Sequence, residues 1–310
     1  MSEQIRQSTG KSKSSVSPGR RIFVKVEPYL YLLPAFVFLL AFIYYPFVKN
    51  FILSFFSVNK YREINGFAGI ANYVRVLADE KFIQAIKNTF IYVITTVPVS
   101  IVIGFALAML ARRRTRISTV YEAMYALTMS MSASVVAMIF QLALNPTMGI
   151  VNKAFGLDIS WLTDPKTALF SLIIIQIWAN IGYNFIFLLS GLRGISEEVI
   201  ESAELDGATG LRLIGNIIIP MLSPTLIFLL VKDIAFAMTT SSFTLILMYP
   251  VFYSGGPGGT TETIMSYVYG KGIAGTNYNA AFAATMVGFV LSAVMMALSL
   301  ILERKKVNYD

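Results

Sequence analysis

Amide side chains recur at a regular spacing inside one long apolar run of this sequence. Gln176, Asn180 and Asn184 stand four residues apart between residues 169 and 190, and Tyr183 lies next to Asn184. Residues four apart share one face of an α-helix, so these side chains are predicted to form a polar stripe. Amides donate and accept hydrogen bonds, which suits sugar hydroxyls, but packing between membrane helices uses the same groups. The stripe therefore indicates either solute contact or interhelical hydrogen bonding.

Two charged residues lie near the middle of the next apolar run, residues 221–248. Lys232 and Asp233 are neighbours, and neighbours on a helix project about 100° apart. They are expected to be poor partners for each other, so that each finds another partner or water. Asp233 is a candidate to bind a substrate hydroxyl or a residue of a second subunit. Hydroxyl side chains follow at Ser241 and Ser242, where they line a solute path or bond to their own backbone.

Residue types that support catalysis are scarce. The chain has no histidine and no cysteine, which removes the commonest metal ligand and general base and any thiolate chemistry. The glycine-rich segment 255–259 lacks the Lys-Ser/Thr that follows a phosphate-binding loop, so it is interpreted as a flexible external turn. No catalytic residue, no metal site and no bound cofactor is predicted for this chain.

The composition is that of a membrane protein. Hydrophobic residues make up 56% of the 310 residues and charged residues only 14%, whereas about a quarter of residues are charged in soluble proteins. The net charge of +8 comes from basic residues that cluster beside apolar runs, where they act as topology signals. The expected partner is a lipid bilayer, and no nucleic acid is expected.

Apolar runs near the length of about 20 residues that crosses a bilayer as a helix occur along most of the chain. They cover residues 29–48, 88–111, 119–143, 169–190, 221–248 and 279–302. The predicted fold is all-α, a polytopic membrane protein with six transmembrane helices in a domain of residues 28–305. Residues 1–27 are mostly polar and are predicted to be a disordered cytoplasmic tail. Residues 306–310 are a short cytoplasmic tail.

Lysine and arginine are unevenly distributed about these runs. Fifteen lie in the two tails and in the loops 112–118 and 191–219, against nine in the other loops. Loops rich in Lys and Arg stay on the cytoplasmic side of a membrane. Both termini and the 191–219 loop are therefore predicted to be cytoplasmic.

The 191–219 loop carries the signals of a short helix. Ser196 is a predicted N-cap, and Glu197 and Glu198 in the first turn suit the positive end of the helix dipole. The helix is expected to run to about Leu205. It would lie on the cytoplasmic face of the bundle.

A sharp turn is predicted after this helix. Asp206-Gly207 is expected to break it, because glycine accepts backbone angles that other residues avoid and aspartate favours turns. A second short helix is predicted over residues 209–216, with Pro220 in the first turn of the next span. Small residues at this corner would let it enter a groove on another protein. The alternative is an ordinary amphipathic loop on the lipid headgroups.

The sequence of this loop resembles the "EAA" loop of permease subunits in ATP-binding-cassette (ABC) importers. Permeases of carbohydrate-type importers, similar to the maltose and glycerol-3-phosphate systems, carry Glu-Ala-Ala, then Asp-Gly-Ala, then a proline at this spacing. The residues in this register are Glu201, Ser202, Ala203, Asp206, Gly207, Ala208 and Pro220. Ser202 stands where the family usually has alanine. In the family this loop passes force from a cytoplasmic ATPase to the membrane bundle.

Further matches to the same family lie on both sides of the loop, over roughly residues 29–305. Upstream they are Asn88-Thr89, Pro98, Asn145 to Asn152, Trp161-Leu162, Asp164-Pro165, Trp178, Gly182 and Gly191-Leu192. Downstream they are Gly255-Gly256-Pro257, Thr261-Glu262-Thr263 and Tyr267 to Tyr269. Ile246-Leu247 stands where many members have Phe-Asp, so no substrate residue is carried over from the family.

The resemblance implies a non-catalytic subunit that forms half of a translocation path in the inner membrane of a prokaryotic cell. The implied partners are a second, homologous permease, two cytoplasmic ATPases that hold ATP and Mg, and an extracytoplasmic solute-binding protein. The implied solute is a sugar or oligosaccharide. Glycerol 3-phosphate is the closest alternative, although an anion favours more basic residues along the path than Lys232 alone. A secondary transporter and a membrane scaffold are more distant alternatives.

Overall fold

The computed structural model describes residues 18–113, 115–239 and 242–304, and the chain divides into two compact units. The first unit covers residues 1–52, and its described part, residues 18–52, is helical: α1 (Pro18–Leu39), a π-helical turn η1 (Leu40–Tyr44) and most of α2 (Tyr45–Leu53). α1 begins at Pro18, a residue favoured at the first helical position. Residues 18–27 are thus helical, in contrast to the predicted disordered tail. Residues 1–17 and 306–310 lie outside the described residues.

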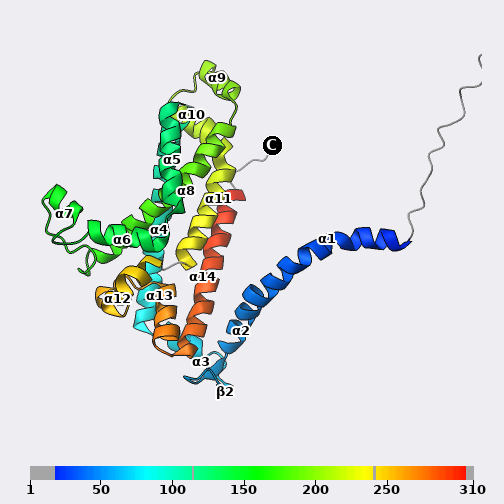
Figure 1. Ribbon diagram of the computed structural model, residues 1–310, viewed down its shortest axis with the longest axis vertical. Coiled ribbons are helices and arrows are strands. Elements are labelled where there is room, and N and C mark those ends of the chain that lie inside the picture. Colours follow the sequence, from blue (N-terminus) through cyan, green and yellow to red (C-terminus); the bar gives the residue numbers. More distant parts are fainter. Residues whose placement is uncertain (1–17, 114, 240–241, 305–310) are drawn as a thin grey trace, which may run out of the picture. The chain divides into compact units, whose positions relative to one another are not determined.

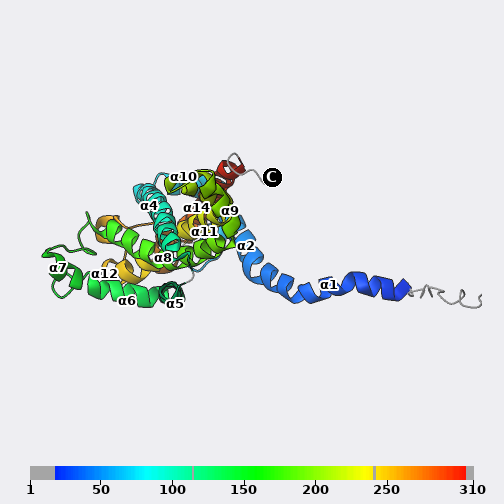
Figure 2. The ribbon, with the colours of Figure 1, turned by 90° about the horizontal axis from the view of Figure 1, so that it is seen from above.

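Four long helices form the centre of the second unit (Figures 1 and 2). They are α4 (Glu80–Ala111), α8 (Ala168–Gly194), α11 (Ile219–Thr239) and α14 (Tyr278–Arg304). α8 packs along α4, and α11 packs against α4, α8 and α14. The backbones of α4 and α8 come close at Gly104, where an added Cβ would lie 2.9 Å from the Cβ of Asn184. A small residue permits this approach, as is common between membrane helices.

Long apolar helices confirm an all-α polytopic membrane protein. In the described part of the chain, five stretches are long and apolar enough to cross a membrane. They are residues 29–53, 80–111, 168–194, 211–252 (with 240–241 undescribed) and 278–301. Each overlaps one of the six predicted spans.

The other predicted span, residues 119–143, is not one straight helix. It consists of α5 (Arg116–Ser130) and α6 (Ala133–Ala143), and the chain bends by 103° between them. The hydroxyl of Ser132 accepts a hydrogen bond from the N–H of Val135, so it caps α6 and starts a new helix. The two helices make a sixth span only if the bent pair counts as one. α7 (Ile150–Phe155) follows them.

A small layer of short elements closes the end of the bundle where α4 begins, opposite α9 (Figure 1). β1 (Phe56–Val58) and β2 (Ile64–Phe67) form an antiparallel hairpin, which the all-α prediction did not include. α3 (Ala71–Leu77) leads from the hairpin to α4. Between α11 and α14 lie η3 (Thr244–Met248), α12 (Tyr249–Phe252), η4 (Pro257–Gly259), α13 (Ile264–Tyr269) and η5 (Gly270–Ala274).

The glycine-rich segment in this layer is packed rather than free, which corrects the interpretation as a flexible turn. Residues 255–257 are buried. The side-chain amide of Asn88 in α4 donates to the backbone carbonyl of Glu262 (2.8 Å). The carboxylate of Glu262 in turn accepts a hydrogen bond from the backbone N–H of Gly255 (2.8 Å). These bonds fasten the segment to α4.

Candidate functional site

The predicted loop lies at the other end of the bundle (Figure 1). It contains α9 (Glu197–Leu205), which has the predicted bounds and the predicted acidic first turn. Ile200 and Ala203 on one side of α9 are buried in an apolar cluster that includes Leu192 of α8 and Leu222 of α11. α9 is therefore fastened to the bundle by its apolar side.

The turn after α9 depends on glycine. Gly207 has φ +84° and Gly210 has φ +56°, and both values lie in the left-handed region that glycine adopts without a Cβ clash. Nothing lies within 4 Å of a Cβ built at either position. The turn thus requires glycine for its backbone conformation and not for lack of space.

Two details of this loop differ from the prediction. Ser196 occupies the N-cap position, but its side chain makes no capping hydrogen bond. The second helix is not separate, because α10 (Leu211–Leu213) continues through the π turn η2 (Ile214–Ile218) into α11. Pro220 therefore lies inside a continuous helix, just after η2. Proline cannot donate a helical hydrogen bond, and a widened turn beside it is a common consequence.

Arg193 connects three helices at the point where the loop leaves α8, which we call the root of the loop. It lies at the end of α8, and its guanidinium is 2.7 Å from the carboxylate of Glu122 in α5. The same group donates to the backbone carbonyls of Ala111 (3.2 Å) and Arg112 (3.4 Å) at the end of α4. A cation at a helix C-terminus satisfies carbonyls that lack a partner within the helix. Movement of this root would therefore be transmitted to α4, α5 and α8 together.

The outer surface of the loop is open. Most of the predicted coupling residues are exposed, namely Glu201, Ser202, Asp206, Gly207 and Pro220, while Ala208 is half-buried and Ala203 is buried. Leu205 and Leu211 flank the turn and are 89% and 86% exposed. A groove of about 910 Å³ lies between α9 and the ends of α4 and α8, with Arg112 and Glu201 among its lining residues. Exposed apolar side chains beside charged ones suit contact with another protein.

The amide stripe on α8 is buried and forms two groups. In the first group, the hydroxyl of Tyr92 in α4 donates to Oε1 of Gln176, and Nε2 of Gln176 donates to Oδ1 of Asn180, both at 2.8 Å. Tyr92 was not among the predicted residues. The same four-residue spacing would have found it, because it marks a second polar stripe on α4, made of Asn88, Tyr92, Thr96 and Ser100.

The second group joins α4, α8 and α11. Nδ2 of Asn184 donates to Oδ2 of Asp233 (2.9 Å) and to the hydroxyl of Ser100 (3.2 Å). Oδ1 of Asp233 lies 2.6 Å from Nζ of Lys232, so the prediction that these neighbours are poor partners was wrong. The flexible four-carbon stem of lysine lets the ammonium fold back over the ring of Tyr183, 3.6 Å from its centroid.

This second group reaches the surface through aromatic side chains, of which Tyr183 was predicted from the sequence and Phe187 and Phe228 were not. Tyr183 stacks on Phe187 at 4.5 Å between ring centroids, and Phe187 lies 5.3 Å from Phe228. The side chain of Lys232 is 26% exposed. The sequence pattern that could have predicted this aromatic surface is the i, i+4 spacing of Tyr183 with Phe187 and of Phe228 with Lys232. Of the two predicted serines, Ser242 is half-buried and Ser241 lies outside the described residues.

Interhelical hydrogen bonds engage Gln176 and Asn184, whereas the bond of Asn180 is to Gln176 on the same helix. The bonds from Tyr92 and from Asn184 join α8 to its neighbours, which was one of the two interpretations of the stripe. Within the described part of the chain, Nδ2 of Asn180 and Oδ1 of Asn184 still lack a hydrogen-bond partner. Solute contact stays a prediction. Among the described residues, no three His, Cys, Asp or Glu side chains gather as metal ligands.

Residues 100–308 match the model of a protein family described as the binding-protein-dependent transport system inner membrane component. One curated relative is the permease protein UgpA of the sn-glycerol-3-phosphate transport system of Agrobacterium fabrum. It is 29% identical over 92% of this chain and 97% of its own length. A probable ABC transporter permease of Pyrococcus horikoshii is 31% identical over 86% of this chain and 92% of its own.

Solved structures show the same likeness. A chain of a bacterial ABC transporter involved in the import of the acidic polysaccharide alginate superposes with a TM-score of 0.79 and 25% identity, over 93% of this chain and all of that one. A chain of the bacterial alginate transporter in complex with a pentasaccharide-bound periplasmic protein gives 0.78 and 26%, over 92% of this chain and 98% of that one.

Proposed function

The chain belongs to the family of binding-protein-dependent transport system inner membrane components, and from that premise we propose how it works. It is a transmembrane subunit of an ABC importer. In our proposal, α9 and the Gly207 turn receive the movement of a cytoplasmic ATPase and transmit it to half of a solute path. The observation that carries the proposal is that α9 and the turn expose their outer surface, while buried apolar contacts and the ion pair of Arg193 with Glu122 fix their base to the bundle.

Force applied to the turn has two routes into the bundle. The first is the root, because Arg193 holds the end of α4 and Glu122 of α5, and the buried side of α9 rests on α8 and α11. The second is α11, because the helix that starts at Leu211 continues to Asp233 in the buried polar group. Such a connection would tilt α11 and α8 as the path opens to one side and then to the other.

The proposed orientation puts the α9 end in the cytoplasm. The loops 112–118 and 191–219 together with the two tails hold fifteen Lys and Arg, against nine in the other loops, and the proposal therefore puts both termini on that side of the inner membrane. The proposed partners are a second permease, two ATPases that bind ATP and Mg, and a solute-binding protein. This chain itself would be non-catalytic. The alginate transporter with its bound periplasmic protein supports the binding-protein partner.

The proposed solute is a sugar or oligosaccharide; the structurally similar alginate transporter also imports a saccharide, although an acidic one. The accessible part of the polar group offers the ammonium of Lys232, which lies over the ring of Tyr183. Asp233 neutralises Lys232 at 2.6 Å, so an anionic solute would compete with an internal carboxylate, and this favours a neutral sugar. Glycerol 3-phosphate is the second candidate, because the UgpA permease of that system is a relative.

Coupling is tested with Gly207→Pro in the complete transporter in proteoliposomes. Proline fixes φ near −65°, whereas Gly207 has φ +84°, so the turn must change. We expect ATP-driven uptake to fall severalfold while the complex still assembles. Gly215→Ala is the matched control, since no atom lies within 4 Å of its added Cβ. Uptake at the parental rate in Gly207→Pro would refute the proposal.

A further inference from the structure

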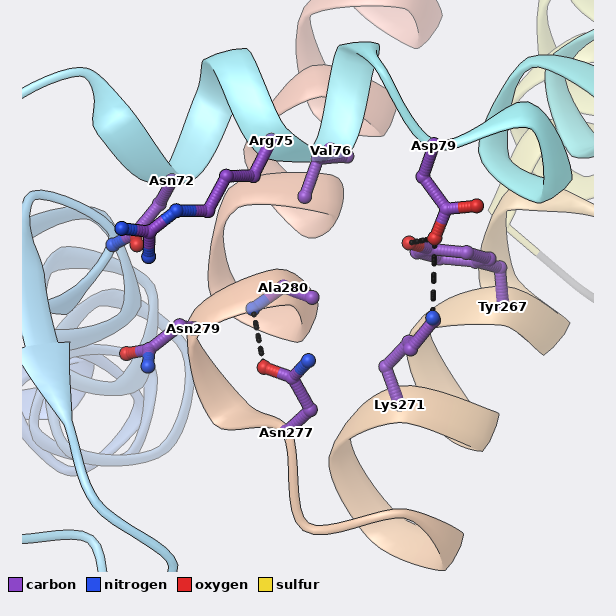
Figure 3. A pocket seen from close by; sticks show the side chains of 9 residues that line it. All are labelled: Asn72, Arg75, Val76, Asp79, Tyr267, Lys271, Asn277, Asn279 and Ala280. Atoms are coloured by element: carbon purple, nitrogen blue, oxygen red, sulfur yellow. Dashed lines mark hydrogen bonds and ion pairs between the residues drawn. The ribbon is translucent and has the colours of Figure 1, made fainter.

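A second site lies at the end of the bundle opposite α9, outside the membrane in the proposed orientation. It is a pocket of about 180 Å³ between α3, the start of α4, the α13–η5 turn and the start of α14 (Figure 3). Its lining residues are Asn72, Arg75, Val76, Asp79, Tyr267, Lys271, Asn277, Asn279 and Ala280.

The carboxylate in this pocket, Asp79, already has hydrogen-bond and ion-pair partners. Asp79 accepts a hydrogen bond from the hydroxyl of Tyr267 (2.7 Å) and lies 3.1 Å from Nζ of Lys271. It also accepts from the backbone N–H of Lys81 at the start of α4 (3.0 Å). Burial by itself raises the pKa of Asp79, but these hydrogen bonds outweigh it and the pKa is lowered. Asp79 is thus ionised at neutral pH and cancels the charge of Lys271.

Arg75 supplies the uncompensated charge. It is exposed and has no ion-pair or hydrogen-bond partner among the residues that the structure describes. Figure 3 shows its side chain extending away from Asp79 and Lys271. Across the pocket, Oδ1 of Asn277 accepts from the N–H of Ala280 (3.2 Å), and its Nδ2 is left to donate. A guanidinium and an amide N–H facing one pocket are donors suited to a carboxylate.

The walls of the pocket are held in place by the hairpin. Nδ2 of Asn72 donates to the carbonyls of Ser54 and Phe56, both at 2.9 Å. Asn279 pairs with both backbone groups of Val58, at 2.7 and 3.0 Å. A guest would therefore meet a preorganised site, which lowers the entropic cost of binding.

The size and surroundings of the pocket favour a side chain of another protein as the ligand. Small-molecule sites usually measure about 300–1,000 Å³, so a pocket of 180 Å³ admits one side chain more readily than an oligosaccharide. Two large apolar side chains stand exposed on neighbouring elements: Tyr61 in the turn of the hairpin that holds the pocket walls (72%), and Ile273 in η5, two residues after Lys271 (69%). Arginine and tyrosine are enriched in protein interfaces.

We propose that this pocket receives one Asp or Glu side chain of a soluble protein that docks on the outer face. The partner is the solute-binding protein, so the inference rests on the function proposed above. The carboxylate would accept hydrogen bonds from Arg75 and from Nδ2 of Asn277. It would locate the binding protein over the bundle and contribute to steering its approach.

The anion preference of the pocket is tested first, without any partner. The chain has no cysteine, so Ala280→Cys gives this chain a single thiol on a residue that lines the pocket, and the assembled transporter is labelled through it. Its labelling rates are compared for an anionic and a cationic methanethiosulfonate reagent. We expect the anionic reagent to be favoured, and the ratio of rates to fall severalfold in Arg75→Ala but not in Lys81→Ala, an exposed neighbour. Equal rates, or a ratio that Arg75→Ala leaves unchanged, would overturn the site.

The partner is tested with the solute-binding protein that copurifies with the complex. We expect it to protect the introduced thiol of Ala280→Cys from labelling and to stimulate the ATPase. Arg75→Glu should raise the concentration needed for half-maximal stimulation by at least about tenfold, while Lys81→Glu leaves it nearly unchanged. Unchanged stimulation and protection in Arg75→Glu would overturn the inference. Loss of ATP-driven uptake from the unaltered chain would instead refute the proposed function, and the thiol's anion preference would be unaffected.

Discussion

The buried polar group around Asn184 and Asp233 and the exposed turn at Gly207 are built in opposite ways. Asn184 and Asp233 are fully buried and bond to each other across α8 and α11. The residues of the turn are exposed, and Gly207 has open space around it. The first region holds helices of the same chain together, while the second leaves its surface for another chain. Substitutions should therefore lower stability in the first region and coupling in the second.

The largest expected effect is at Asp233. Asp233→Ala removes the partner of the Lys232 ammonium and the acceptor for Asn184. Removing one member of a buried ion pair typically costs about 3–5 kcal/mol; Lys232 is 26% exposed, so we expect a cost near the lower end of that range and a clear drop in the melting temperature of the detergent-solubilised protein. Asp233→Asn keeps an acceptor for Asn184 and should cost less. Equal melting of Asp233→Ala and the parent would show that the group does not hold the helices together.

A smaller effect is expected at Gly104, beside the same group. A Cβ there would lie 2.9 Å from the Cβ of Asn184 and 3.2 Å from the backbone nitrogen of Phe185. Overpacking of this kind costs about 1–3 kcal/mol, which thermal unfolding of Gly104→Ala can measure. Gly215→Ala, with nothing within 4 Å, is the control. If both variants melt alike, the close approach of α4 and α8 is not needed.

Gly207→Ala tests the exposed turn in the same comparison. Alanine in the left-handed region costs about 1 kcal/mol, and the turn is far from the core, so the melting temperature should change little. We expect the ratio of uptake to ATP hydrolysis to fall more than the amount of folded protein. Gly194→Ala, which is open but lacks a positive φ, should leave that ratio intact. Parallel losses of folding and uptake would remove the distinction between the two regions.

The smallest effect concerns pH and Asp79, which lies in neither region. Its pKa in the folded protein is lowered, so its stabilising contribution is present above the unfolded pKa of about 3.9 and is lost as pH falls through the folded value. The parent should therefore lose slightly more stability than Asp79→Asn when acidified below about pH 4. Melting curves of both proteins across this range measure the difference. Identical pH profiles would contradict the role of Tyr267 and Lys271.

Several features follow from the sequence because they depend on local interactions. Apolar runs of membrane length locate the spans, with α1 starting earlier than expected. The acidic first turn and Asp206-Gly207 fix both ends of α9, since glycine at positive φ is a property of the single residue. The four-residue spacing of Gln176, Asn180 and Asn184 fixes the face that they share.

Tertiary structure decides which groups meet across that face. Periodicity orients a side chain on its own helix but says nothing about the helix opposite, so the bonds of Gln176 to Tyr92, 84 residues away, and of Asn184 to Asp233, 49 residues away, appear only when α4, α8 and α11 are packed. The break between α5 and α6 and the pocket beside Arg75 also need several segments to come together. Burial likewise comes from packing, and it separates the residues that hold the bundle from those left for a partner.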